Sequence, residues 1–150
     1  MESLNNVEIH VFCKEGESEA DILGGLKLLL PLDFEKEKIR MERKTVFGFD
    51  EKKIIIIDVS INKNKQIRIF IDNINKNLSQ EQKDMIIRQA ESRLDHNLDF
   101  FMRFDKDKII NEKIFWIIDK GNCYHVRMNI AAFPKRRDVA LELVRNKIFK

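Results

Sequence analysis

The sequence predicts a single α+β domain, residues 1–150, with a largely antiparallel sheet and packed helices. Segments with apolar residues at every second position, typical of strands, are mixed with segments of helical periodicity. The chain ends in a pattern of two strands and a helix, and the turn Lys120-Gly121-Asn122 between those strands favours a hairpin. A chain of this length buries about 68–70% of the surface of its unfolded form, so it can fold without the support of disulfide bonds or a bound metal.

The first two elements are a strand and a helix. Residues 6–14 alternate in polarity and predict a strand. Ser18 precedes an apolar stripe and is suited to cap a helix, which Pro31 ends. Gly24 and Gly25 lie inside this helix at a cost of about 1 kcal/mol each relative to alanine. We therefore expect the helix to approach the sheet closely at these glycines.

Two strands and two helices are predicted next. Residues 34–47 predict an extended, partly exposed strand. Residues 53–61, KIIIIDVSI, begin with apolar residues at both odd and even positions, so both faces of the segment are apolar there. They predict a central strand covered on both faces. Apolar residues at helical spacing predict a helix over 64–76, and Ser79 is suited to cap another over 79–94.

The last third of the chain predicts three strands and a helix. Residues 98–104 return to period two, with the apolar side chains on one face. Residues 113–119 and 124–133 predict the two strands of the hairpin. Pro134 fits the first turn of a final helix that ends at about residue 148.

Charge is distributed unevenly along the chain. The net charge is +3, but residues 1–33 carry two basic and seven acidic groups, whereas residues 105–150 carry eleven and six. This asymmetry suggests a basic face that binds an anionic partner, and an ordinary mixed surface is the alternative. The chain shows no run of 18 apolar residues and no signal peptide, so we expect a cytoplasmic protein that does not enter a membrane.

Two strands carry residues suited to RNA. Phe101 and Arg103 lie on the less apolar face of 98–104, and His125 and Arg127 on that of 124–133. If these faces coincide, the arginines could bind phosphates and an aromatic ring could stack on an unpaired base. The alternative is that the phenylalanine packs beneath a helix and the arginines pair with acids.

A basic triplet, Lys135-Arg136-Arg137, follows Pro134. Cations at the start of a helix oppose its dipole, which suggests a role other than helix stability. Free N–H groups at a helix N-terminus and three cations would suit a phosphate. A solvated run, partly offset by neighbouring acids, is the alternative.

The sequence offers no catalytic motif. Asp105 and Asp107 could suggest a metal-dependent nuclease, but lysines interleave with them and would repel a cation. The three histidines lie near no recognisable nucleophile motif. We expect no enzymatic activity, no catalytic residue, no metal site and no cofactor. Cys13 and Cys123 lie in or beside strands, and we expect reduced thiols; a disulfide between them is the alternative if the two strands are neighbours.

The run LSQEQKDMIIRQAESRLDHNLDFFMRFDK, followed by the predicted hairpin and AAFPKRRDVALELVRNKI, resembles an archaeal family of predicted exosome subunits and RNA-binding proteins. The order of elements matches over about residues 6–149. The most specific parts are Arg103-Phe104-Asp105-Lys106 and Pro134-Lys135-Arg136-Arg137. The resemblance implies an archaeal source, a domain similar to that of a ribosomal protein that binds 5S ribosomal RNA, and a role in RNA processing or translation without a catalytic site.

These observations predict an accessory protein that binds RNA mainly through phosphates, with exosome- or ribosome-associated proteins as further partners. The predicted RNA contacts are Phe101, Arg103, Lys106, Arg127, Lys135, Arg136 and Arg137. One alternative is a protein-interaction module that docks on an RNA-processing complex without touching RNA. Another is a nuclease that uses Asp105 and Asp107.

Overall fold

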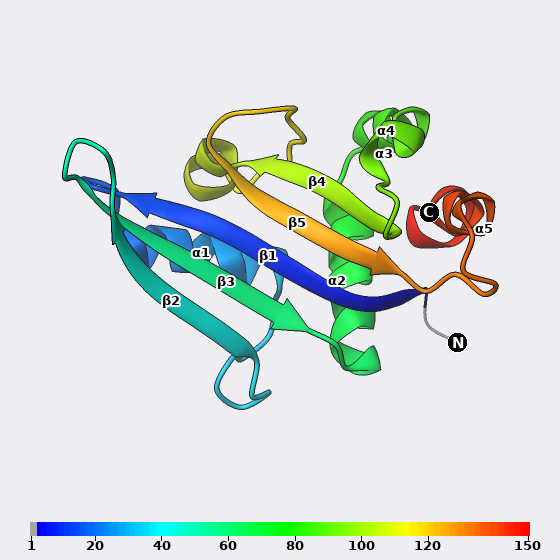
Figure 1. The fold of residues 1–150 in the computed structure, drawn as a ribbon, viewed down its shortest axis with the longest axis horizontal. Coiled ribbons are helices and arrows are strands. Elements are labelled where there is room, and N and C mark those ends of the chain that lie inside the picture. Colours follow the sequence, from blue (N-terminus) through cyan, green and yellow to red (C-terminus); the bar gives the residue numbers. More distant parts are fainter. Residues whose placement is uncertain (1–2) are drawn as a thin grey trace.

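A five-stranded antiparallel sheet forms the centre of the computed structural model, which describes residues 3–150 (Figure 1). The strand order is β2-β3-β1-β5-β4, and every neighbouring pair is antiparallel. The strands are β1 (Leu4–Lys14), β2 (Arg40–Phe47), β3 (Lys53–Ile61), β4 (Asp99–Asp105) and β5 (Cys123–Ile130). The predicted α+β class with an antiparallel sheet is confirmed.

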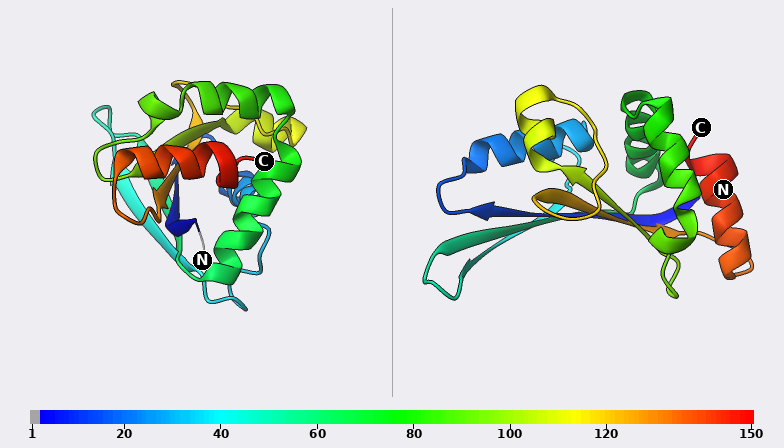
Figure 2. Two further views of the ribbon diagram at one scale, coloured as in Figure 1. Left: turned by 90° about the vertical axis from the view of Figure 1, so that its right-hand side faces the viewer. Right: turned by 90° about the horizontal axis from the view of Figure 1, so that it is seen from above.

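The helices leave one face of the sheet open. They are α1 (Glu19–Leu29), α2 (Asn64–Asn77), α3 (Gln80–Arg88), α4 (Ala90–Arg93), η1 (Lys108–Glu112), α5 (Arg137–Leu143) and η2 (Val144–Ile148). Figure 2 shows α1 to α4 and η1 on the same side of the sheet, with α5 at one end of it. Accordingly β4 and β5 alternate strictly between buried and half-buried residues. No helix within residues 3–150 is long and apolar enough to cross a membrane.

Local signals in the sequence fixed several elements as predicted. The Ser18 hydroxyl accepts the Asp21 N–H at 3.2 Å at the start of α1, and the Ser79 hydroxyl accepts the Gln82 N–H at 3.1 Å at the start of α3. These contacts satisfy N–H groups that have no partner inside a helix. The helix predicted over 79–94 is divided at Gln89 into α3 and α4.

The prediction that residues 53–61 form a central strand covered on both faces is wrong. β3 lies second from the edge, and β1 is the central strand. Ile55 and Ile57 are buried, but Ile54 and Ile56 are only half-buried because they point to the open face. An apolar run shows that a strand can be covered on both faces, and the placement of the helices decides whether it is.

The predicted terminal hairpin is also wrong. Residues 113–119 run along the outer edge of β4, where the Asp105 N–H bonds the Trp116 carbonyl and the Ile118 N–H bonds the Arg103 carbonyl, both at 2.9 Å. β5 lies between β1 and β4, so both of its edges are occupied and it has none free for residues 113–119.

The last helix begins later than predicted. β5 ends at Ile130, and an irregular loop leads to Arg136, which precedes the first turn of α5. Pro134 therefore lies in the loop and not in the helix.

Candidate nucleic-acid interface on the open face of the sheet

The open face carries a balanced mixture of charges. Alternate residues of the five strands point to it, as the burial pattern and the strand register define. Its cations are Lys14, Arg40, Lys44, Arg103 and Arg127, and its carboxylates are Glu8, Glu42, Asp58, Asp99 and Asp105. The predicted basic face is therefore not a property of the whole sheet, because five acidic side chains offset the five basic ones.

Four of the residues that the sequence suggested share this face. Phe101 pairs with Arg127, and Arg103 pairs with His125, across β4 and β5. The Phe101 and His125 rings stack, with centroids 5.4 Å apart and planes 25° apart. The predicted coincidence of the two strand faces is confirmed, and Phe101 does not pack beneath a helix.

The cations on this face differ in whether they have acidic partners. Arg127 pairs with Glu8, and Arg40 pairs with Glu42 at 2.6 Å. Arg103 and Lys14 form no ion pair with any residue in the described range 3–150. The charge of Arg127 is thus largely compensated within the protein, whereas Arg103 and Lys14 are left for solvent or a ligand.

The sheet splits near the middle of β1. Pairing between β1 and β5 ends at His10 and His125, but β1 continues with β3 as far as Lys14, and β5 continues with β4 as far as Cys123. The two central strands therefore diverge, as Figure 1 shows. A cavity of about 520 Å³ lies at the divergence, and we call it the splay pocket. It is lined by His10, Val11, Phe12, Lys14, Arg103, Lys106, Gly121, Asn122, Cys123 and His125.

Aromatic and basic groups dominate the lining of the splay pocket. Phe12 is 44% exposed, and its ring meets the His10 ring edge to face at 5.0 Å. The lining includes the cations Lys14 and Arg103 but no carboxylate. Burial, followed by the repulsion of Arg103, His10 and Arg127, lowers the pKa of His125. This imidazole is therefore largely neutral near pH 7.

Sequence reasoning missed His10, Phe12 and Lys14. They lie at alternate positions of β1, opposite its buried residues. An aromatic residue on the otherwise polar face of a strand was the available signal for Phe12.

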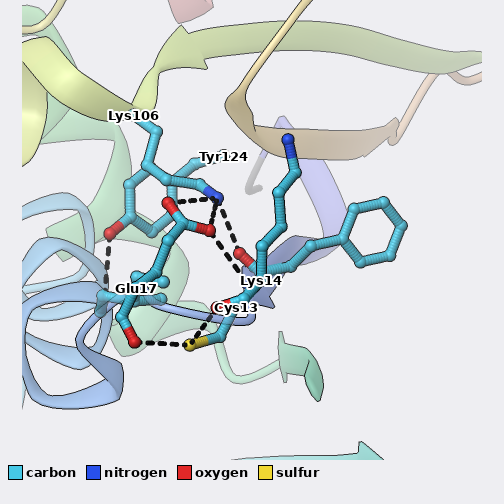
Figure 3. Close-up of polar contacts among 7 residues, drawn as sticks. Cys13, Lys14, Glu17, Lys106 and Tyr124 are labelled. Carbon is cyan, nitrogen blue, oxygen red and sulfur yellow. Dashed lines mark hydrogen bonds and ion pairs between the residues drawn. The ribbon is translucent and has the colours of Figure 1, made fainter. Parts of the chain in front are cut away.

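Lys106 lines the splay pocket but is only 1% exposed, and Figure 3 shows its ammonium group beside the Glu17 carboxylate. Its Nζ donates to the Phe12 carbonyl at 2.7 Å and to both carboxylate oxygens of Glu17, at 3.2 and 3.4 Å. Phe12 lies beyond the last β1–β5 pair, so this ammonium supplies the hydrogen bond that a β5 N–H would otherwise make. Prediction of Lys106 as an RNA contact is corrected, because its charge is turned inward.

Glu17 completes this buried contact. Burial by itself would raise the pKa of Glu17, but hydrogen bonds from the Lys14 N–H and the Lys106 ammonium outweigh it and hold the pKa below its usual value. Glu17 is therefore ionised at neutral pH and compensates the charge of Lys106.

A close approach of α1 to β5 supports the same region. The Tyr124 hydroxyl donates to the Ile22 carbonyl at 2.8 Å, and burial raises the pKa of this hydroxyl. A Cβ on Gly25 would lie 2.0 Å from the Tyr124 oxygen, whereas one on Gly24 would meet nothing within 4 Å. The expected approach of helix to sheet is confirmed at Gly25 alone.

The basic triplet Lys135–Arg137 lies beyond the end of β5, and we call it the basic loop. The Arg137 guanidinium donates to the carbonyls of Leu94, at 2.9 Å, and Glu91. Arg136 pairs with Asp138 at 3.0 Å. Arg137 therefore holds α4 and its neighbouring turn, and Arg136 has an acidic partner, whereas the phosphate site at this helix start stays a prediction.

The two cysteines point to opposite faces. Cys13 is buried on the helical side, where its thiol contacts the Glu17 carbonyl oxygen at 3.6 Å, whereas Cys123 lines the splay pocket on the open face. Both are free thiols. Burial is the main cause that raises the pKa of Cys123.

No group of three His, Cys, Asp or Glu side chains within residues 3–150 converges as a metal site. The carboxylate of Asp105, one of the two acids considered for a nuclease, accepts the Lys108 N–H at 3.1 Å.

Comparisons with known proteins agree on the family and the fold. The family model described as RNA binding matches residues 6–130. The chain is 26% identical over 141 residues to the RNA-binding protein PAB1135 of Pyrococcus abyssi, covering 94% of this chain and 91% of that protein. It is 24% identical to the uncharacterized protein MJ0213 of Methanocaldococcus jannaschii, covering 97% and 98%.

Solved structures show the same fold. Mth689, a DUF54 protein from Methanothermobacter thermautotrophicus, superposes with a TM-score of 0.80 at 21% identity and covers 99% of this chain and 100% of its own. The DUF54 protein AF2318 from Archaeglobus fulgidus gives a TM-score of 0.81 at 18% identity, covering 95% and 97%.

Proposed function

Because the chain belongs to the RNA-binding family whose model matches residues 6–130, we propose that it binds unpaired RNA on the open face of its sheet. The observation that carries this proposal is the stacked pair Phe101–His125, with Arg103 and Arg127 directly opposite them in register. Aromatic rings on a sheet accept unpaired bases at about 1–3 kcal/mol per base, and arginines beside them hold phosphates.

The mixed charge of the face changes the expected mode of binding. The predicted contacts Lys106 and Arg137 have internal partners, so few cations remain for phosphates. If Lys14 and Arg103 each hold one phosphate, raising salt from about 50 to about 200 mM weakens binding to single strands roughly sevenfold. Stacking then contributes much of the affinity, and duplex RNA, whose bases are paired, binds less tightly.

Fluorescence anisotropy with a labelled single-stranded RNA of about 12 nucleotides, and with its duplex, tests the proposal. Phe101→Ala should weaken binding of the single strand about tenfold. The matched control is Phe133→Ala, because Phe133 is 86% exposed but lies in the loop that precedes α5. Equal effects of the two substitutions, or no binding at low salt, would refute binding on the open face.

We further propose that the protein binds RNA without cleaving it and acts as an accessory in RNA processing or translation. The stacked rings of Phe101 and His125 on the open face support binding, and the assignment to the exosome or ribosome stays a prediction from the resemblance. Incubating labelled RNA with the protein and Mg²⁺ or Mn²⁺ tests the first point, since cleavage that Asp105→Asn abolishes would contradict it. Affinity purification from the source cells tests the second.

A protein-interaction module is the second candidate, and the turn between β2 and β3 favours it. Phe47 is 71% exposed there and Phe49 is fully exposed, although large apolar side chains are normally covered. Phe47→Ser with Phe49→Ser should abolish a protein complex if this candidate is right. The same pair of substitutions should leave RNA affinity unchanged if the open face is the binding surface.

A further inference from the structure

The splay pocket has the size and the chemistry of a site for one nucleotide. Its volume of about 520 Å³ lies within the range of about 300–1,000 Å³ usual for sites that enclose small ligands. Building on the RNA binding proposed above, we propose that the splay pocket holds one unpaired ribonucleotide of the bound RNA. The base lies against Phe12, and its phosphate lies on Lys14 and Arg103.

Charge distinguishes this pocket from its neighbour on the same face. A second hollow, of about 320 Å³, is lined by Glu8, Glu42 and Asp58, with Arg40 already paired to Glu42. An RNA phosphate would be repelled there. The splay pocket instead presents two cations, Lys14 and Arg103, that form no ion pair within residues 3–150, and a bound phosphate would supply one.

The walls of the splay pocket are fixed before any ligand arrives. The Lys106 ammonium satisfies the Phe12 carbonyl where β1 leaves β5, which supports β1 at the edge of the gap between the strands. The contact between the His10 and Phe12 rings holds the exposed ring in place. A site of fixed shape loses little conformational entropy on binding.

The pocket favours a nucleotide that is free of a base pair. A base in a duplex is stacked and paired, so it can enter a cavity between two strands only after it is extruded. Gly121, with φ of +109°, adds no side chain to the rim. The ligand is therefore an end, a bulge or a loop of the RNA.

Cys123 provides the readout for a test, because it lines the pocket while Cys13 is buried on the opposite face. The full chain is alkylated with iodoacetamide, and mass spectrometry follows each cysteine separately. The probes are AMP, adenosine, inorganic phosphate and the single-stranded RNA used above. We expect AMP at about ten times its Kd, or saturating RNA, to slow alkylation of Cys123 about tenfold. Adenosine and phosphate at the same concentration should protect far less.

Two substitutions test the assignment of residues. Arg103→Gln should abolish protection by AMP, whereas Lys135→Gln, a cation of the basic loop outside the pocket, should leave it intact. Phe12→Ala should weaken AMP protection about tenfold with little change for phosphate. Thermal melts of each variant confirm that it is folded, and Phe12 is exposed enough for its removal to be tolerated.

The outcomes separate this inference from the proposed function. RNA binding by anisotropy without protection of Cys123 overturns the pocket and leaves RNA binding standing. Protection by AMP without RNA binding overturns the proposed function and supports a site for free nucleotides. Equal protection by phosphate and AMP shows an anion site that does not recognise the base, and this also overturns the inference.

Discussion

The splay pocket and the basic loop contrast in how their charges are used. In the basic loop three cations adjoin in sequence, but Arg137 donates to backbone carbonyls and Arg136 pairs with Asp138. In the splay pocket the cations Lys14 and Arg103 come from strands that are far apart in sequence, and neither forms an ion pair within residues 3–150. A run of basic residues thus indicates charge that is present, and only the fold shows whether that charge is available to a ligand.

Removing Lys106 should have the largest effect, because it supports the splay pocket from beneath. Lys106→Met keeps the aliphatic stem but leaves the Phe12 carbonyl and the Glu17 carboxylate without their donor. We expect the free energy of unfolding to fall by about 2–4 kcal/mol. Urea denaturation measures this change.

Arg137→Met is the matched substitution in the basic loop. Its guanidinium bonds two carbonyls at an exposed site, so the expected loss is only about 1 kcal/mol. If the two variants lose equal stability, Lys106 does not have the supporting role that its burial indicates.

Gly25→Ala should have the next largest effect. The added Cβ would lie 2.0 Å from the Tyr124 oxygen and 2.6 Å from the ring carbon that bears it. Helix α1 must move away from β5, and overpacking of this kind costs about 1–3 kcal/mol. Gly24→Ala is the control, and it should gain up to about 1 kcal/mol because its Cβ meets nothing. Two similar losses would mean that helix propensity, and not the approach to Tyr124, governs these glycines.

Charge removal compares the two regions directly. Lys14→Gln with Arg103→Gln should weaken binding of single-stranded RNA about tenfold or more. The slope of the logarithm of affinity against the logarithm of salt concentration should decrease by the contribution of two phosphate contacts. Lys135→Gln with Arg136→Gln removes the same net charge but should change affinity less than about threefold. Anisotropy titrations at several salt concentrations measure both. The reverse ranking would make the basic loop the binding surface.

Much of the fold followed from local patterns, whereas the pocket did not. Period-two alternation identified β1 and β4, an apolar run identified β3, and the serine caps identified the starts of α1 and α3. The same alternation placed Phe101, Arg103 and Arg127 on one face. Which strands become neighbours is decided by long-range pairing, so residues 113–119 were wrongly joined to β5.

The splay pocket depends on where two strands separate, and no local pattern shows that. Lys106 illustrates the difficulty. Its sequence context of alternating charges predicts a solvated lysine, but the unpaired carbonyl of Phe12, 94 positions away in sequence, draws its ammonium inside. A buried lysine of this kind can be recognised only once the fold shows which acceptor groups surround its ammonium.

The smallest expected effect concerns pH and His125. In the folded protein its pKa lies below the ordinary value, first because of burial and then because of Arg103, His10 and Arg127. Below about pH 6.5 the unfolded chain therefore takes up a proton that the folded chain resists. Stability should fall as the pH drops from about 7.5 to about 5.5, and His125→Gln should reduce that fall.

RNA should oppose this effect of acid. A phosphate on Arg103 reduces the repulsion that His125 feels, which raises its pKa in the complex. The complex then binds a proton more readily than the free protein, so affinity for RNA should increase as the pH falls. Anisotropy at about pH 7.5 and about pH 6 measures the increase, and in His125→Gln it should be reduced. An affinity that is independent of pH in the unmodified protein would place the phosphate away from His125, and with it away from the wall that the splay pocket shares with β5.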